Sequence, residues 1–272
     1  MKIYEEIING SRSKPILLDV HEPIKKIKSI IIFSHGFKGF KDWGTFNKMA
    51  IFFASKGYVF VKFNFSYNGT SIESPDNFVD LDAFANNNFT TELDDLGLVI
   101  NWVRIRYKNS PISLFGHSRG GAISILKSAE DSRITSLITW SSPSDLLKRL
   151  SKNNRLKQWK KDGVLYIFNS RTQQNMPMNY QFYEDCLNNF ERLNMQNAIK
   201  SISIPHLIVH GDEDSTVSVD EAKEMKLLNN NVSIIIIRSA DHVFNSYHPY
   251  MKSSMPNNLQ SAIDESILFL KS

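Results

Sequence analysis

The chain has 272 residues, of which 42% are hydrophobic and 22% are charged, and its formal net charge is +4. This length and composition suit one large α/β domain with a sizeable core, and the weak, dispersed positive charge argues against nucleic acid as a partner. No apolar run reaches the roughly 18 residues of a membrane span, and no secretory signal is recognisable. A single cysteine, Cys186, excludes an internal disulfide, so we expect a cytoplasmic protein.

Short apolar runs alternate with helix-length segments from residue 28 onward, after an antiparallel hairpin expected over the first 21 residues. Strands are expected at residues 30–34, 58–65, 112–116, 137–140, 207–211 and 232–238. Most of these runs are continuous rather than alternating, which is typical of parallel strands covered by helices on both faces. The sequence therefore predicts an α/β fold with a mostly parallel central sheet.

Helices are expected where apolar residues recur at helical spacing, at residues 93–103, 122–129 and 259–270. Ser218, followed three residues later by Glu221, predicts a capping-box start for another helix. The strand–helix alternation fails between residues 142 and 202, which is too long for a single crossover. We expect a core of residues 1–141 and 203–272, with 142–202 inserted as a lid of irregular loops and one or two short helices.

The beginning of this insertion, residues 146–161, is basic and contains no acidic residue. One interpretation is a solvated helix face. The other is attraction of an acidic substrate or a membrane surface.

The sequence Gly-His-Ser-Arg-Gly at 116–120 lies between a buried strand and an amphipathic helix. Glycines at both ends allow a sharp strand-to-helix turn that holds the hydroxyl of Ser118 out above the sheet. Since a serine hydroxyl is a poor nucleophile without a base, this pattern requires a histidine from elsewhere in the chain. His242 follows the last strand at the carboxyl edge of the sheet and is the favoured base, with His248 as the second candidate.

An imidazole base needs a carboxylate to orient it and to stabilise its cation. Residues 211–217 follow a strand and contain Asp212, Glu213 and Asp214. We favour Asp214, because a residue further along the loop can turn back across the strand ends, and Asp212 is the alternative. The developing oxyanion requires two backbone N–H donors, for which Arg119, after the serine, and Phe37, in the loop after the strand at 30–34, are the candidates.

Together these segments resemble the α/β-hydrolase superfamily over nearly the whole chain. The stretches "HGFKGFKDWGTF", "GHSRGG", "HGDEDSTV" and "ADHVF" are similar to its dienelactone hydrolase-like and cinnamoyl or feruloyl esterase-like branch. The resemblance implies Ser118 as nucleophile, Asp214 as acid, His242 as base, and the Phe37 and Arg119 amides as the oxyanion hole. Dienelactone hydrolases carry a cysteine nucleophile, so the serine here favours ester hydrolysis over that lactone activity.

The expected activity is hydrolysis of carboxylic esters with short-chain or aromatic acyl groups, through an acyl-enzyme and without a metal or cofactor. Alternatives are a peptidase or thioesterase of the same fold, or a binding protein on a hydrolase scaffold. The expected partner is a small-molecule ester, and a homodimer is an open possibility. Candidates for the walls of the acyl pocket are Trp159, Tyr166, Met176, Met178, Tyr180 and Phe244.

Overall fold

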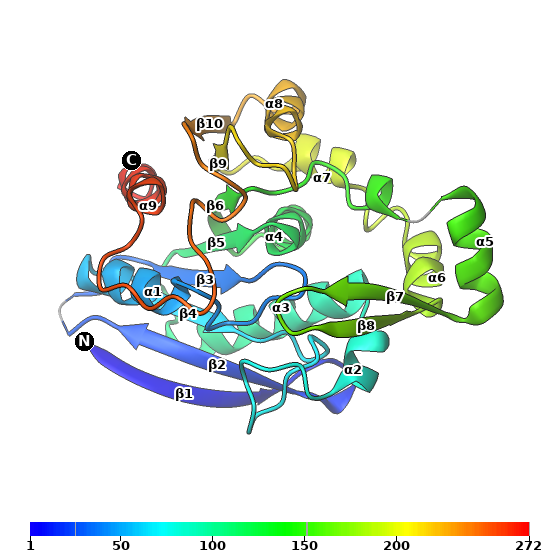
Figure 1. Cartoon of the computed structure of the whole chain (residues 1–272). Coiled ribbons are helices and arrows are strands. Elements are labelled where there is room, and N and C mark those ends of the chain that lie inside the picture. The colour runs from blue at the N-terminus through cyan, green and yellow to red at the C-terminus, as the bar shows by residue number, and fades with distance from the viewer. Residues whose placement is uncertain (25, 151, 272) are drawn as a thin grey trace.

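The computed structural model describes residues 1–24, 26–150 and 152–271. Its main body is an eight-stranded sheet with strand order β1-β2-β4-β3-β5-β6-β9-β10, and a separate two-stranded sheet, β7-β8, projects from one side (Figure 1). The expected α/β architecture is therefore confirmed.

The N-terminal hairpin consists of β1 (Lys2–Asn9) and β2 (Pro15–Glu22), which pair antiparallel as expected. β2 also pairs antiparallel with β4 (Val59–Phe63), with Leu18 opposite Phe63. This pairing attaches the hairpin to one edge of the parallel sheet.

The remaining strands are β3 (Ile30–Ser34), β5 (Ile112–His117), β6 (Ile134–Trp140), β9 (His206–Gly211) and β10 (Val232–Ile237). All run parallel to β4, so their carboxyl ends lie at one edge of the sheet. Each lies where a continuous apolar run predicted it. β6 begins three residues earlier than expected.

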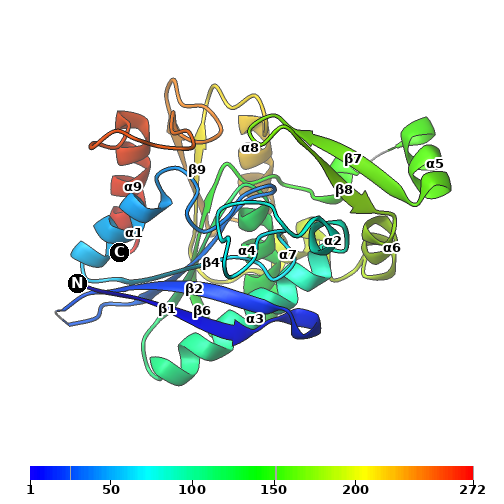
Figure 2. The same cartoon turned by 60° about the horizontal axis from the view of Figure 1, so that its bottom comes forward.

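Helices cover both faces of the sheet (Figure 2). One face is covered by α3 (Phe89–Arg106), α4 (Arg119–Glu130), α7 (Met195–Ser201) and α8 (Val219–Leu228). The other is covered by α1 (Phe46–Ser55) and α9 (Asn257–Phe269). The apolar core is divided by the sheet into two clusters accordingly. The short α2 (Leu81–Ala85) lies near the two-stranded sheet and contacts β8.

The chain between β6 and β9 contains more regular structure than the sequence predicts. It comprises a 3-10 turn (Leu147–Arg149), α5 (Asn153–Asp162), β7 (Val164–Asn169), β8 (Gln174–Asn179) and α6 (Gln181–Asn188), followed by α7. The expectation of irregular loops was wrong for β8. Pro177 lacks an N–H donor, but a two-stranded sheet leaves one side of each strand unpaired and so tolerates it.

The predicted insertion, residues 142–202, thus includes one helix of the main body, because α7 packs against α4 and α8. The chain between β6 and α7 is described at residues 141–150 and 152–194, and we call it the inserted segment. Its α5 and α6 lie beyond the β7-β8 sheet in both views (Figures 1 and 2).

The start of α8 differs in detail from the capping box that Ser218 and Glu221 predicted. The Ser218 side chain accepts a hydrogen bond from the backbone N–H of Asp220. The Glu221 carboxylate does not return to Ser218 but accepts hydrogen bonds from Ser144 and pairs with Arg149. Tertiary contacts with the inserted segment therefore replace half of the local cap.

Among the helices in the described ranges, none combines the length and apolarity that crossing a bilayer would require.

Candidate active site

Ser118 lies on the sharp turn between β5 and α4 and has a positive φ, with φ 55° and ψ −124°. A non-glycine residue with this conformation is strained, and such strain is concentrated at functional sites. The strain is maintained by the regular elements on both sides of the turn. The Ser118 N–H donates to the carbonyl oxygen of Trp140 on the neighbouring strand.

The two glycines of the motif are required by close backbone approach. A Cβ at Gly116 would lie 2.2 Å from the carbonyl oxygen of Gly120, and a Cβ at Gly120 would lie 2.2 Å from the carbonyl oxygen of Ser34. Real Cβ contacts are never this short. The turn therefore packs directly against the end of β3, where the candidate oxyanion loop begins.

Ser118, His242 and Asp214 form a continuous hydrogen-bonded chain, although they are far apart in the sequence. The Ser118 hydroxyl lies 3.0 Å from His242 Nε2, and His242 Nδ1 lies 2.8 Å from Asp214 Oδ2. With Nδ1 protonated, Nε2 is free to accept the serine proton. The three side chains come from the ends of β5, β9 and β10, so the parallel sheet brings them together.

The environment of Asp214 keeps it ionised. Burial opposes its charge, but hydrogen bonds from His210 and His242 and from the Val217 N–H outweigh this and hold the pKa of Asp214 well below its usual range. Its Oδ1 accepts from the N–H groups of Thr216 and Val217. A permanent carboxylate in this position fixes the His242 tautomer and stabilises its cation.

The alternative acid and base lie elsewhere. Asp212 is exposed and accepts a hydrogen bond from the Ser239 N–H. His248 accepts from the Gly44 N–H through Nδ1, and its ring packs against Phe40 and Trp43. Neither residue is hydrogen-bonded to Ser118 or His242 in the described structure.

The Gly36–Phe37 turn lies against Ser118, since a Cβ at Gly36 would be 3.0 Å from the Ser118 Cβ. Within the described residues the Phe37 N–H donates to no backbone acceptor. Arg119 is the first residue of α4, so its N–H has no partner within the helix. Both candidate oxyanion donors are thus next to the serine and unused.

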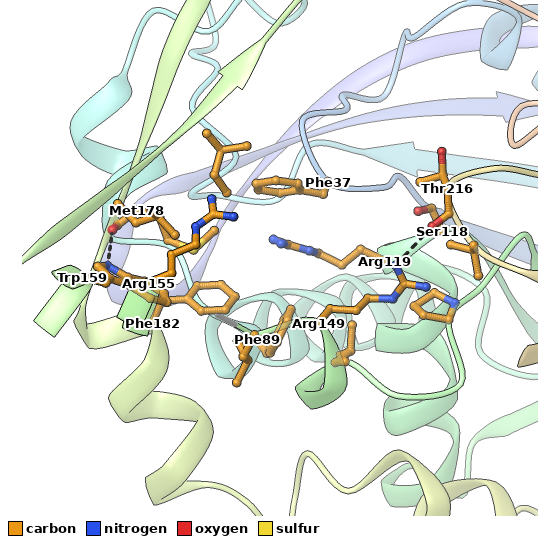
Figure 3. A pocket seen from close by; sticks show the side chains of 16 residues that line it. Phe37, Phe89, Ser118, Arg119, Arg149, Arg155, Trp159, Met178, Phe182 and Thr216 are labelled. Atoms are coloured by element: carbon orange, nitrogen blue, oxygen red, sulfur yellow. Dashed lines mark hydrogen bonds between the residues drawn. The ribbon is translucent and has the colours of Figure 1, made fainter. Parts of the chain in front are cut away.

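A cavity of about 360 Å³ opens beside Ser118 (Figure 3), a size found for small-molecule sites. Its walls come from the loops after β3 and β9, from α3 and α4, and largely from the inserted segment. Most of the lining residues are apolar, and three are arginines. Besides Ser118, the cavity is lined by Phe37, Phe89, Arg119, Pro143, Leu146, Arg149, Leu150, Arg155, Trp159, Leu165, Ile167, Met178, Phe182, Thr216 and Val217.

The structure corrects most of the predicted pocket wall. Trp159 and Met178 line the cavity, and the Trp159 Nε1–H donates to the Met178 carbonyl. Tyr166 is 59% exposed on the outer face of β7, because neighbouring residues of a strand point to opposite sides. Met176 is buried in a separate cluster with Phe40, Phe78 and Phe84.

The other two predicted pocket residues also lie outside the cavity. Tyr180 packs edge-on against Trp159, at 5.8 Å between ring centroids, and stacks on Tyr183. Phe244 is buried against Trp140 on the opposite side of the sheet. Both predictions were therefore wrong, since these rings stabilise other contacts.

The sequence analysis missed two histidines that contact the hydrogen-bonded residues Ser118, His242 and Asp214. His117 donates from Nε2 to the backbone carbonyl of His242. His210 Nε2 lies 3.2 Å from Asp214 Oδ2 and 2.9 Å from the Val217 carbonyl oxygen. The position of His210, four residues before Asp214 at a strand end, was the only available signal.

Two other residues with chemically reactive side chains, Cys186 and His35, have structural roles. Cys186 is buried, and burial raises the pKa of its thiol to about 12, so it is unreactive at neutral pH. His35 donates a hydrogen bond from Nδ1 to the Gly36 carbonyl and so stabilises the turn. Nowhere in residues 1–24, 26–150 and 152–271 do three or more histidine, cysteine or acidic side chains gather as a metal site would require.

Sheet order, crossovers and the serine-bearing turn define the α/β-hydrolase fold. The chain is similar to the structure of a putative hydrolase from Agrobacterium vitis S4, with a TM-score of 0.74, 17% identity, and coverage of 99% of this chain and 100% of that one. It is also similar to Est1E from Butyrivibrio proteoclasticus bound to ferulic acid, with a TM-score of 0.73, 16% identity, and coverage of 97% and 98%.

A third similar structure is the esterase domain of a Rhodothermus marinus protein, with a TM-score of 0.66, 17% identity, and coverage of 99% of this chain and 97% of that one. No protein-family profile and no curated protein sequence matches the chain. At these identities, the similarity to solved structures establishes the fold.

Proposed function

We propose that the protein is a serine hydrolase that cleaves carboxylic esters, with Ser118 as nucleophile, His242 as general base and Asp214 as the orienting acid. The observation that supports this most strongly is the hydrogen-bonded chain from Ser118 Oγ through His242 to Asp214 at the wall of a cavity. A pure binding protein has no need of such a chain. The class of activity follows from these roles.

In the proposed cycle Ser118 Oγ attacks the ester carbonyl while its proton moves to His242 Nε2. The Phe37 and Arg119 N–H groups donate to the oxyanion, and Asp214 stabilises the imidazolium. Collapse of the tetrahedral intermediate breaks the bond to the alkoxy oxygen, which takes the proton from His242 and leaves as the alcohol. Water, deprotonated by His242, then hydrolyses the acyl-enzyme and releases the carboxylic acid.

Ester rather than peptide or thioester cleavage is favoured by the names of similar structures, which include an esterase domain and Est1E bound to ferulic acid. The apolar lining of the cavity, with Trp159, Phe89 and Phe182, suits a short-chain or aromatic acyl group.

We also propose that the inserted segment acts as a lid. It supplies most of the residues that line the cavity, among them Leu150, Trp159 and Ile167. Without it, the serine would lie on an open sheet edge exposed to water.

The test is hydrolysis of 4-nitrophenyl acetate, butyrate and octanoate and of methyl ferulate by the purified wild type and by Ser118→Ala. We expect turnover by the wild type and a loss of about 10⁴-fold or more in the variant. Ser132→Ala, at an exposed serine outside the site, is the matched control and should retain full activity.

Inactivity of the wild type towards all four esters would overturn the esterase proposal. A thioester and a peptide series would then be assayed with the same variants. Activity that survives in Ser118→Ala would instead exclude Ser118 as nucleophile.

A further inference from the structure

Three arginine side chains line the otherwise apolar cavity next to Ser118. Figure 3 shows the guanidinium groups of Arg119 and Arg155 entering the cavity from opposite sides, below Phe37. Arg119 begins α4, whereas Arg149 and Arg155 belong to the inserted segment. An apolar cavity is an unfavourable place for cations unless each has a partner.

Two of these charges are paired within the protein. Arg119 Nη1 lies 3.3 Å from Oε1 of the buried Glu92, and its guanidinium lies 3.9 Å from the centroid of the Phe37 ring. Arg149 pairs with Glu221 and donates to the Thr216 carbonyl. Each of these two guanidinium groups therefore has a carboxylate partner within the protein.

Arg155 differs from the other two. Among residues 1–24, 26–150 and 152–271, no carboxylate forms an ion pair with it and no acceptor forms a hydrogen bond with it. The residue is exposed, so water hydrates its charge in the empty cavity. Because Arg155 lines the cavity together with apolar residues such as Trp159 and Leu150, a bound molecule would displace part of this water.

A neutral molecule that fills the cavity would remove part of the water around the Arg155 guanidinium and offer no hydrogen-bond acceptor in its place, which is unfavourable. A molecule with a negative group would pair with it, and the planar guanidinium can donate two parallel hydrogen bonds to a carboxylate. Because one charge lacks a partner, a singly charged group matches it best.

We propose that the substrate is an ester that carries a carboxylate on the part that occupies the cavity, and that Arg155 binds this carboxylate. The inference rests on the proposed function, since it takes Ser118 as the site of cleavage. It also assigns a role to the basic segment 146–161: Arg155 acts in the cavity, whereas Lys157 on the same helix does not line it.

The test compares charged and neutral esters with the same carbon skeleton. On the acyl side, mono-4-nitrophenyl glutarate is compared with 4-nitrophenyl valerate. On the alcohol side, 4-acetoxybenzoate is compared with 4-acetoxybenzamide. Rates are corrected for spontaneous hydrolysis, and the quantity measured is the ratio of kcat/KM for the charged ester to that for its neutral partner.

We expect the wild type to prefer the charged ester in at least one pair, and Arg155→Gln to lower that ratio by about tenfold, the effect of one charge-assisted hydrogen-bonded pair. Arg155→Lys should restore part of the ratio. Lys157→Gln removes the same charge from the same helix and should leave the ratio unchanged. Equal ratios in the wild type and Arg155→Gln, or an equal loss in Lys157→Gln, would overturn the proposal.

A binding measurement separates this inference from the proposed function. By calorimetry, 4-phenylbutyrate should bind more tightly than 4-phenylbutanamide, and Arg155→Gln should remove the difference. This result with no turnover of any ester would overturn the esterase proposal but leave the carboxylate site standing. Turnover of neutral esters with no preference for a carboxylate in either assay would support the esterase proposal and overturn the carboxylate site.

Discussion

His117 Nε2 donates a hydrogen bond, 2.9 Å long, to the backbone carbonyl oxygen of His242. The residue before the candidate nucleophile thus holds the backbone of the candidate base, and the two rings lie 5.0 Å apart. Burial, followed by the nearby His242 charge, lowers the pKa of His117 to about 3, so its ring is neutral at physiological pH. A neutral ring holds His242 in place without competing for its proton.

We therefore expect His117 to be a positioning residue. His117→Ala should lower kcat by about tenfold, the effect of one lost hydrogen bond to the His242 backbone, and change KM by less than twofold. His117→Gln retains an N–H donor and should recover part of kcat. Steady-state kinetics on 4-nitrophenyl butyrate, with thermal unfolding of each variant, would check this. Losses in stability that account for the fall in activity, with no recovery in the glutamine variant, would show a purely structural role.

The two candidate acids of the loop after β9 should behave very differently. Asp214→Asn breaks the hydrogen bond that fixes the His242 tautomer and should lower kcat by about 10⁴-fold. Asp212→Asn changes an exposed carboxylate that caps the Ser239 N–H and should retain activity within a few fold. Paired kcat measurements on one ester decide the assignment. A large loss in the Asp212 variant alone would reverse it.

The close packing of the serine-bearing turn predicts a large effect of one methyl group. In Gly120→Ala the new Cβ would lie 2.2 Å from the Ser34 carbonyl oxygen, so β3 and α4 would have to separate. We expect a loss of more than about 3 kcal/mol in the free energy of unfolding.

Gly163→Ala, at the end of α5, is the control for this effect. Its Cβ would meet nothing within 4 Å, and only the positive φ of 74° opposes it. Alanine at this positive φ should lower the free energy of unfolding by about 1 kcal/mol. Denaturant unfolding of Gly120→Ala and Gly163→Ala measures the loss of unfolding free energy in each. Similar losses in the two variants would contradict the packing argument.

Buried histidines predict that stability falls in mild acid. His206 is buried at the start of β9 and bonds Thr139, and burial lowers its pKa to about 3. The unfolded chain binds a proton there below about pH 6.5, whereas the folded protein does not until about pH 3. The contribution of neutral His206 to the free energy of unfolding is therefore fully present above pH 6.5 and is lost as the pH falls from 6.5 towards 3.

At pH 5.5 this one histidine should contribute about 1.4 kcal/mol to the loss. Urea unfolding at pH 7.5 and 5.5 measures the loss in the wild type and in His206→Gln. The variant should lose about 1.4 kcal/mol less than the wild type over this interval. Equal losses would mean that His206 is protonated in the folded state.

The sheet and the serine-bearing turn could be predicted because their signals are local. A continuous run such as Ile30–Ser34 is apolar because both of its faces are covered, and that property can be read from the run alone. The glycines beside Ser118 are required by contacts within and next to one turn. The loops that carry the candidate acids and bases could be expected to meet near Ser118, since the carboxyl ends of parallel strands share one edge. The sequence favoured Asp214 and His242 but left Asp212 and His248 as alternatives.

The cavity could not be predicted in this way, because its walls depend on which way each side chain points. In β7, where the sequence analysis expected no strand, Leu165 and Ile167 face the cavity and Tyr166 faces solvent, because neighbouring residues of a strand point to opposite sides. Met176 and Phe244 are apolar enough for a pocket but are buried in other clusters.

Hydrophobicity and local spacing thus predict which residues are buried and which chain segments meet at the sheet edge. They do not predict which buried residues face one another, and so they missed the contacts from His117 and His210. They also identified the charge of segment 146–161 without singling out Arg155, because a charge becomes a binding group only through the partners that the fold places or fails to place beside it.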